Sequence, residues 1–413
     1  MKRTFWLVVG MAGVYSLLFM QAQMHRMGGA VIAPHLGQEL ALGTGELGLI
    51  IGVMFMASAA AQPVSGVLLD RFGPVKAVSY MSPLAILGMV LFATADSVLQ
   101  LALARALIGA GFACVVSGLY VFLLGWVDRK NFTTAAATIQ ALPGTASVFV
   151  ASTPLAVGLA TLGREPVFLT LAATTLGFVV LVALTVREGP LSKRSQQKPQ
   201  TVRESFAGIA TILKDRGYLW LAVFSVSAIG PSFSVIGLLS GVYLQERFEL
   251  EPTALGNAVF VLLIALNLGG VIYGPLDRWT GRRKLVMACG IGIQVIMLFV
   301  LAALGDELGL WTTLWLLVAF AAFSQLHALV IAHAQSLFGS ELAGRVITTT
   351  NLFMIGGIFI FQFASGLSHD LFTSVFNLSH TDGYRLTFAA LAICQCIGLV
   401  LYRCAPIPQA SDR

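Results

Sequence analysis

Long apolar runs alternate with short polar connections along almost the whole chain. Most runs hold about 20 residues or more, which is the length at which a helix crosses the hydrocarbon core of a bilayer. The alternating strands of about ten residues that form membrane barrels are absent. The pattern therefore predicts an all-α polytopic membrane protein with twelve transmembrane helices, at residues 5–34, 46–68, 76–95, 98–124, 133–160, 166–186, 217–243, 254–275, 285–304, 311–338, 345–368 and 385–403.

The second half of the chain repeats features of the first half at a fixed offset. A charged loop at 66–76 recurs in altered form at 274–284, and Leu47-Gly48 is echoed by Leu255-Gly256, in both cases 208 residues later. Duplicated halves are a common plan of secondary transporters. With the polar stretch in the middle as a flexible linker, we predict a six-helix half at 1–188, a cytoplasmic linker at 189–214 and a second six-helix half at 215–413.

Composition agrees with a membrane protein and excludes several other classes. Apolar residues make up 57% of the chain, charged residues 11%, and the mean hydropathy is +0.86, whereas a soluble domain has about 25% charged residues. The net charge of +6 is spread over loops and indicates no nucleic-acid partner. The five cysteines show neither a disulfide framework nor metal spacing, so we expect them to pack in helices and we expect no metal site and no cofactor.

The distribution of basic residues predicts the orientation. If the N-terminus is cytoplasmic, the cytoplasmic connections and both tails hold 20 of the 25 Lys and Arg, and the outer loops hold three, Arg164, Arg247 and Arg385. Basic residues favour the cytoplasmic side. We therefore expect an integral protein of the plasma (inner) membrane with both termini in the cytoplasm. Two glycine pairs, Gly48/Gly52 and Gly237/Gly241, have the spacing that lets helices approach closely.

The charged loop resembles a known motif. In the sequence Gly66-Val67-Leu68-Leu69-Asp70-Arg71-Phe72-Gly73-Pro74-Val75-Lys76, five positions match the motif between the second and third helices of the major facilitator superfamily: Gly66, Leu68, Asp70, Arg71 and Gly73. Leu69, Pro74 and Val75 depart from it. In the second copy Gly274, Leu276, Gly281, Arg282 and Arg283 match, but the acid is one place early at Asp277, with Arg278 in its position. The resemblance implies that superfamily's fold and a transporter rather than an enzyme.

The same resemblance implies a gating role for this loop. In the superfamily the acid bridges the two halves near the start of the eleventh helix, where this chain has Arg345. We expect Asp70 and Arg345 to latch the halves on the inner side, and we assign Arg71, Gly73 and Arg278 to the same gating loops. The alternative interpretation is that these charges only set the topology.

The ionisable residues inside the predicted helices are basic or neutral. All 19 acidic residues lie in loops, in tails or at segment ends, whereas Arg105, His327 and His333 lie within segments, as do His25 and Arg26 if the first helix is long. A charge in the bilayer costs several kcal/mol and usually marks a polar cavity or a proton relay. The structural alternatives are an arginine that bonds backbone carbonyls and histidines that pack.

In the superfamily, helices one, four, seven and ten line the central cavity, and the resemblance places most of these residues there. We predict substrate contacts from Arg26, Arg105, His327, Tyr120 and Gln21, and proton coupling by His25, His327 or His333, because histidine titrates near physiological pH. The seventh helix adds hydroxyls at Ser225, Ser227, Ser232, Ser234 and Tyr243.

A cavity with arginine and without carboxylates suits an anion, because a guanidinium binds carboxylate or phosphate through a planar fork of donors. We therefore predict a monomeric alternating-access transporter of a small organic anion of the carboxylate type, working by proton symport or by exchange. Alternatives are an exporter of amphipathic drugs, a copper importer using Met20, Met24, His25 and Met27, or a non-transporting membrane sensor. Neither His-Glu-x-x-His nor Gly-x-Ser-x-Gly is present, and Gly366-Leu367-Ser368-His369-Asp370 is interpreted as the polar outer end of the eleventh helix.

Overall fold

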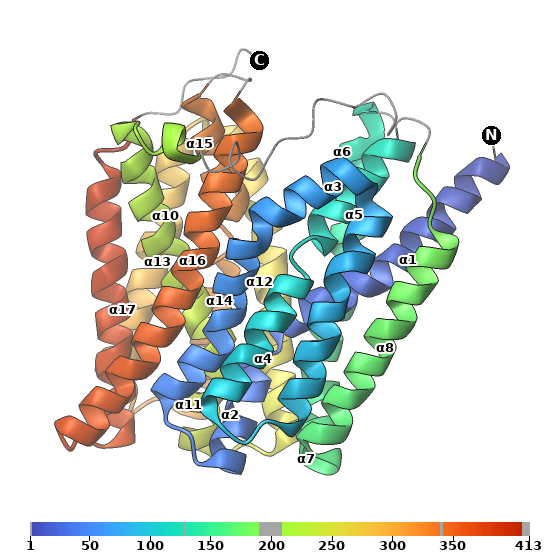
Figure 1. The fold of residues 1–413 in the computed structure, drawn as a ribbon. Coiled ribbons are helices and arrows are strands. Elements are labelled where there is room, and N and C mark those ends of the chain that lie inside the picture. The colour runs from blue at the N-terminus through green and yellow to red at the C-terminus, as the bar shows by residue number, and fades with distance from the viewer. Residues whose placement is uncertain (1, 128, 190–208, 339–341, 407–413) are drawn as a thin grey trace. The chain divides into compact units, whose positions relative to one another are not determined.

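The computed structural model describes residues 2–127, 129–189, 209–338 and 342–406, and in these residues the regular structure is helical (Figure 1). Large apolar side chains such as Leu184, Val271 and Trp311 are 70–77% exposed, as expected where lipid rather than water surrounds the helices. The elements are α1 (Lys2–Met27), α2 (Gly29–Leu40), α3 (Thr44–Thr94), α4 (Val98–Gly111), α5 (Val115–Trp126), α6 (Arg129–Ala151), α7 (Thr153–Leu162), α8 (Arg164–Thr185), α10 (Arg216–Ser234), η2 (Val235–Leu239), α11 (Ser240–Phe248), α12 (Pro252–Thr280), α13 (Arg283–Leu304), α14 (Leu310–Ala322), α15 (His327–Ser336), α16 (Ala343–Asp370), η4 (Leu371–Val375) and α17 (His380–Tyr402).

Eleven helical stretches in the described residues are long and apolar enough to span a membrane, and one of them represents two crossings. Helix α3 has 51 residues, about 76 Å at 1.5 Å per residue, which is far more than one bilayer needs. Gly73 interrupts it with φ 77° and ψ 172°, a conformation that residues with a side chain rarely adopt. The helix therefore divides at the charged loop, and the predicted all-α fold with twelve crossings is confirmed.

Four crossings are interrupted at related places in the two halves. The first is broken at Gly28 between α1 and α2, and the seventh contains the π-helical turn η2. The fourth is broken at 112–114 between α4 and α5, and the tenth at 323–326 between α14 and α15. Interrupted helices leave backbone groups available in the middle of a bundle, and many secondary transporters build their sites at such interruptions.

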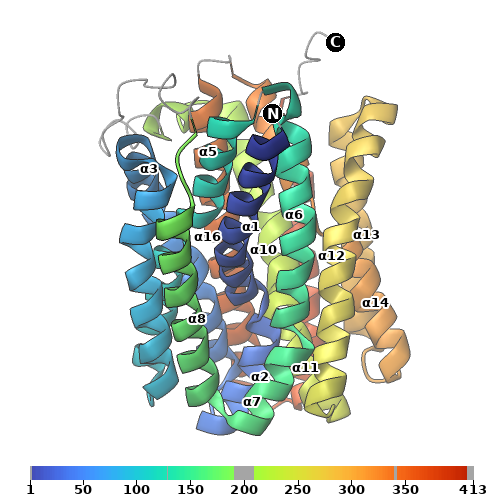
Figure 2. The same ribbon diagram turned by 90° about the vertical axis from the view of Figure 1, so that its right-hand side faces the viewer.

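The chain divides into two compact units, of which the first holds Met1–Gly28 and Val53–Phe206. In this unit α1 packs between α6 and α8, as Figure 2 shows. Gly109 of α4 packs so closely on the backbone of Met54 in α3 that a side chain there would collide with the Met54 carbonyl. Close packing at a glycine brings α3 and α4 together beside α1.

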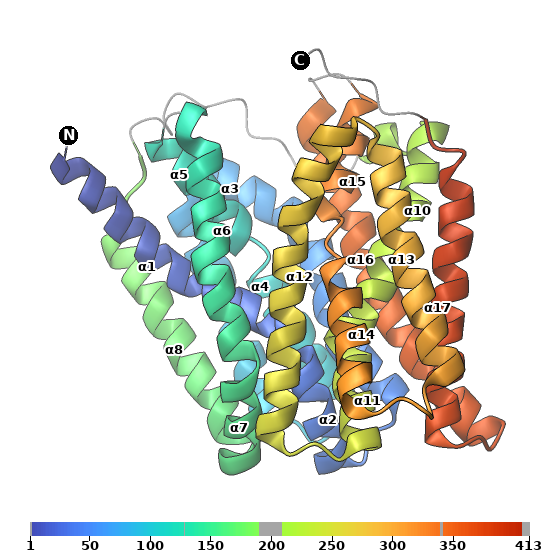
Figure 3. The same cartoon turned by 180° about the vertical axis from the view of Figure 1, so that it is seen from behind.

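The second unit holds Gly29–Gly52 and Ala207–Arg413. Here α10 packs against α16 and α17, while α12 lies beside α14 and α13 beside α17 (Figure 3). Gly48 lies against the Gln362 carbonyl and Gly241 against the Ala30 carbonyl, so the close approach predicted at both glycine pairs is confirmed. The predicted boundaries at 188 and 214 remain a prediction, and most of the predicted linker lies outside the described residues.

Candidate functional site

Arg105 is a fully buried basic residue of the first unit. Its side chain, on α4, is 0% exposed, and its Nη2 donates to the main-chain oxygen of His25 at 3.2 Å. Its Nε and Nη1 atoms have no hydrogen-bond partner in the described part of the chain. A buried donor without a partner costs about 1–3 kcal/mol, and more when it is charged. The guanidinium is therefore tied only in part to the backbone, and two of its donor atoms remain available.

The last turn of α1 carries a second arginine, next in sequence to the residue that Arg105 contacts. Arg26 follows directly after His25 and donates from Nη2 to the hydroxyl of Ser58 on α3 at 3.1 Å. The buried His25 ring lies 5.7 Å from the ring of Phe112 and 6.0 Å from that of Phe168. Neither of its ring nitrogens has a partner among the described residues. The break in the fourth crossing, which begins at Phe112, thus faces the end of α1.

No Asp or Glu side chain is buried among the residues whose burial the structure describes. Arg105 therefore has no fully buried carboxylate as a counter-charge within the described residues. An uncompensated buried charge is strongly destabilising, so a buried guanidinium in this setting has an energetic reason to take up a further acceptor.

The other residues predicted to contact substrate or metal in this unit differ in how far their side chains are buried. Gln21 is buried on α1 and donates from Nε2 to the carbonyl of Leu171 on α8 at 3.3 Å. Tyr120 is half-buried on α5. Met24, from the alternative copper cluster, is buried at 1% exposure. Their substrate or metal contacts remain predictions.

The two remaining histidines of the prediction lie in the second unit and have different surroundings. His327, at the start of α15, shares a hydrogen bond of 3.0 Å between its Nε2 and the Oδ1 of Asn351 on α16. His333 is bonded at both ring nitrogens, through Nδ1 to the Tyr402 hydroxyl at 2.7 Å and through Nε2 to the Pro406 carbonyl at 3.0 Å. Proton coupling remains a prediction for both histidines.

A buried polar network in the second unit was not predicted. Gln294 on α13 accepts from the Ser232 hydroxyl at 2.6 Å and from Gln395 Nε2 at 2.9 Å, and donates to the carbonyl of Phe323 at 2.7 Å. Tyr273 donates to the same carbonyl at 2.7 Å. The network supplies hydrogen-bond donors to the Phe323 carbonyl, which lies at the break in the tenth crossing. In the sequence, the indication of this network is a glutamine inside each of the apolar runs 285–304 and 385–403, Gln294 and Gln395.

The other predicted seventh-helix hydroxyls are also buried, and they bond mainly within their own unit. Ser225 and Ser227 donate to carbonyls one turn earlier. Ser234 shares a 2.6 Å hydrogen bond with Ser365 of α16. These hydroxyls stabilise the packing of α10, and the structure gives no separate indication of ligand contact.

The predicted gating residues lie around the two related loops. Asp70 and Arg71 are exposed, and the Arg71 guanidinium lies 5.2 Å from the centre of the Phe72 ring. Arg278 is exposed too, while its neighbour Asp277 pairs with Arg283 at 2.9 Å. Asp70 and Arg345 belong to different units, so their latch remains a prediction.

Besides the Asp277–Arg283 pair, the second unit has a carboxylate contact that the sequence does not predict, at Asp370. Asp370, on the last turn of α16, accepts hydrogen bonds from the backbone N–H groups of Thr44 at 2.9 Å and Gly45 at 2.7 Å. These are the first residues of α3, so the carboxylate caps that helix from a position 326 residues away. Only the fold brings these residues together.

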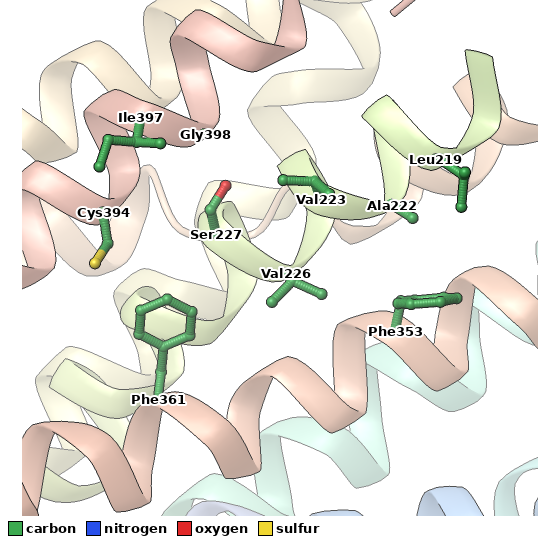
Figure 4. A pocket seen from close by; sticks show the side chains of 10 residues that line it. All are labelled: Leu219, Ala222, Val223, Val226, Ser227, Phe353, Phe361, Cys394, Ile397 and Gly398. Carbon is green, nitrogen blue, oxygen red and sulfur yellow. The ribbon is translucent and has the colours of Figure 1, made fainter. Parts of the chain in front are cut away.

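A cavity of about 350 Å³ lies between α10, α16 and α17 (Figure 4). Its lining is apolar apart from Ser227 and Cys394, and Val223 and Ile397 at its edge are 44% and 54% exposed. With no charged residue in its lining, it cannot select an ion by charge. Its exposed apolar edge is the kind of surface that lipid chains cover.

Comparison with known proteins gives a consistent result. The model of the family described as Major Facilitator Superfamily matches residues 11–362. The chain is 27% identical over 289 residues to "Probable sulfoacetate transporter SauU" of Cupriavidus necator, an alignment that spans 66% of this chain and 66% of that relative, just under two thirds of its length. Among solved structures, the nucleoside transporter NupG aligns with a TM-score of 0.76 at 11% identity, over 95% of this chain and 99% of that one. A D-xylose-proton symporter aligns with a TM-score of 0.72 at 13% identity, over 99% of this chain and 100% of that one. At such identities the two structures establish the fold.

Proposed function

Because the chain belongs to the Major Facilitator Superfamily of membrane transporters, we propose that it is a secondary transporter of a small organic anion. The family supports a small-molecule substrate, a lipid environment and a protein that is not an enzyme. We propose further that Arg105 and Arg26 contact the anion and that movement is driven by proton symport or by exchange.

The observation that carries the anion assignment is the partly unpaired Arg105 guanidinium. Two of its donor atoms lack partners among the described residues, and Arg26 beside the acceptor residue His25 supplies a second guanidinium. A carboxylate or sulfonate would accept from these donors and balance their charge. An organic cation would need a carboxylate, and none is buried among the residues whose burial is described.

The relative from Cupriavidus necator gives independent support, since its name assigns it a small organic anion, sulfoacetate. For coupling, both ring nitrogens of His25 lack a hydrogen-bond partner among the described residues, and His327 shares a hydrogen bond with the side chain of Asn351. Protonation of either residue during transport is part of the proposal.

Thermal unfolding of the purified protein in an anion-poor buffer tests the assignment, with sulfoacetate and succinate as anionic probes and choline as the cationic probe. A ligand at 100 times its Kd stabilises the folded state by about 2.7 kcal/mol. We expect both anions, or one of them, to raise Tm and choline to leave it unchanged.

Arg105→Lys and Arg26→Gln should each raise the Kd for the anion at least tenfold. Lysine keeps the charge of Arg105 but loses the planar fork of donors. Glutamine removes the charge of Arg26. The matched control is Arg247→Lys, since the Arg247 guanidinium in the second unit also bonds main-chain oxygens, those of Asp306 and Leu308. An anion response retained in Arg105→Lys and Arg26→Gln, or a response to choline alone, would contradict the proposal.

A further inference from the structure

A compact group of potential metal ligands lies in the second unit, well apart in sequence from the anion site. Glu246 comes from α11, His369 from α16 and His380 from the first residue of α17. One ligand atom from each of the three lies within 4.8 Å of the other two. The sequence alone indicates a polar helix end at His369 and predicts no metal site.

The chemistry of His369 distinguishes this group from an ordinary cluster of surface charges. The ring is 1% exposed, and its Nε2 has no hydrogen-bond partner in the described chain. Its Nδ1 is held at 3.0 Å from the Thr44 hydroxyl and 3.5 Å from Asp370 Oδ1. A metal-bound histidine is usually oriented in this way, with its second nitrogen bonded to a neighbouring polar group.

The remaining two ligands, Glu246 and His380, lie near the His369 ring on exposed side chains that can change rotamer. His380 is 73% exposed and Glu246 38% exposed, and His380 Nδ1 lies 3.6 Å from Glu246 Oε2. The Tyr384 hydroxyl donates to the same carboxylate oxygen at 2.9 Å, which fixes its direction. Gly383 leaves the His369 edge open, because a Cβ there would lie 3.2 Å from Nε2.

From this geometry we propose that Glu246, His369 and His380 form a binding site for a divalent transition metal of the zinc type. Two imidazoles and one carboxylate are a ligand set that suits zinc and does not suit magnesium or calcium. Tetrahedral zinc with bonds of about 2.0–2.1 Å needs ligand atoms about 3.4 Å apart. The exposed His380 and Glu246 side chains reach that spacing by small rotations around the fixed His369 ring.

The site does not depend on the proposed anion transport. Bound zinc would fasten the ends of α11, α16 and α17 to one another. Its fourth coordination position would be left to water.

The test is titration of tag-free purified protein with zinc chloride, followed by calorimetry and by the metal content after dialysis. We expect one zinc per chain and a rise in Tm that magnesium chloride does not reproduce. His380→Ala and Glu246→Gln should each raise the zinc Kd at least tenfold, and both residues are exposed enough for the fold to tolerate the change. His369→Gln should abolish saturable binding.

The matched control is His35→Ala, which removes a histidine whose Nε2 lies 3.5 Å from Glu39 in a simple i,i+4 pair. This variant should bind zinc like the wild type. Absence of saturable zinc binding in the wild type would overturn the proposal, and so would binding that His380→Ala leaves unchanged. Because the readout is metal content, failure here leaves the anion response of the protein as a separate result.

Discussion

Removing the Asp370 carboxylate should release the first turn of α3 from α16. The two hydrogen bonds from Thr44 N and Gly45 N measure 2.9 and 2.7 Å. Bonds to a charged acceptor contribute about 1.5–3 kcal/mol each, and loss of an N-cap costs about 0.5–2 kcal/mol. Asp370 is 31% exposed, so solvent screening places the expected loss in Asp370→Ala near 1–2 kcal/mol.

A loss of that size changes the ratio of closed to open local states by about 5–30-fold. Hydrogen exchange measured on peptides that contain Thr44 and Gly45 should therefore accelerate by that factor. Asp370→Asn keeps one acceptor oxygen and should give an intermediate effect. The control is Glu46→Gln, because Glu46 accepts from the N–H of Gly43, three residues away, at 3.0 Å. Unchanged exchange at Thr44 and Gly45 in Asp370→Ala would refute the reasoning.

Two further predictions concern stability. Gly73→Ala should lower the unfolding free energy by about 1–2 kcal/mol, because φ is +77° and the new Cβ would collide with the Glu188 carboxylate. Thermal unfolding checks this, with Gly66→Ala as the control because nothing lies within 4 Å of a Cβ at that position. Equal Tm values for the two variants would argue against the prediction. Gln294→Leu should lower the unfolding free energy by about 1–3 kcal/mol, since the Phe323 carbonyl loses one of its donors and Gln395 loses the shorter of its two hydrogen bonds. A denaturation midpoint equal to that of the wild type would contradict this.

The helices could be predicted from the sequence because each is about as long as the bilayer is thick and strongly apolar. The repeat at 208 residues also indicated duplicated halves, and the interruptions in the first and seventh, and in the fourth and tenth, crossings fall at related places. Arg105 could be singled out because a lone arginine in an apolar run has few structural explanations. A bond to backbone carbonyls was among the alternatives, but neither the His25 carbonyl as the acceptor nor the two donor atoms without partners among the described residues could be foreseen.

The remaining parts of the site depend on contacts between residues far apart in sequence. Asp370 and Thr44 are separated by 326 positions, and no local pattern links an acid at one helix end to the N-terminus of another. Glu246 and His380 belong to different helices and resemble ordinary loop residues in the sequence. Gln294 was overlooked because a single amide in an apolar run has no periodicity of its own.

The glycine contacts in the second unit have a kinetic consequence. Gly48, Gly241 and Gly366 each meet a main-chain carbonyl of a partner segment, those of Gln362, Ala30 and Thr44. Such surfaces touch through Cα hydrogens and oxygens, which are weak contacts worth about 0.5–1 kcal/mol each. Segments that meet through their backbones can separate without rearranging interdigitated side chains or changing their rotamers. The activation barrier for separating these segments should therefore be low. An alanine at any of the three glycine positions would place its Cβ against a main-chain carbonyl and force the segments apart.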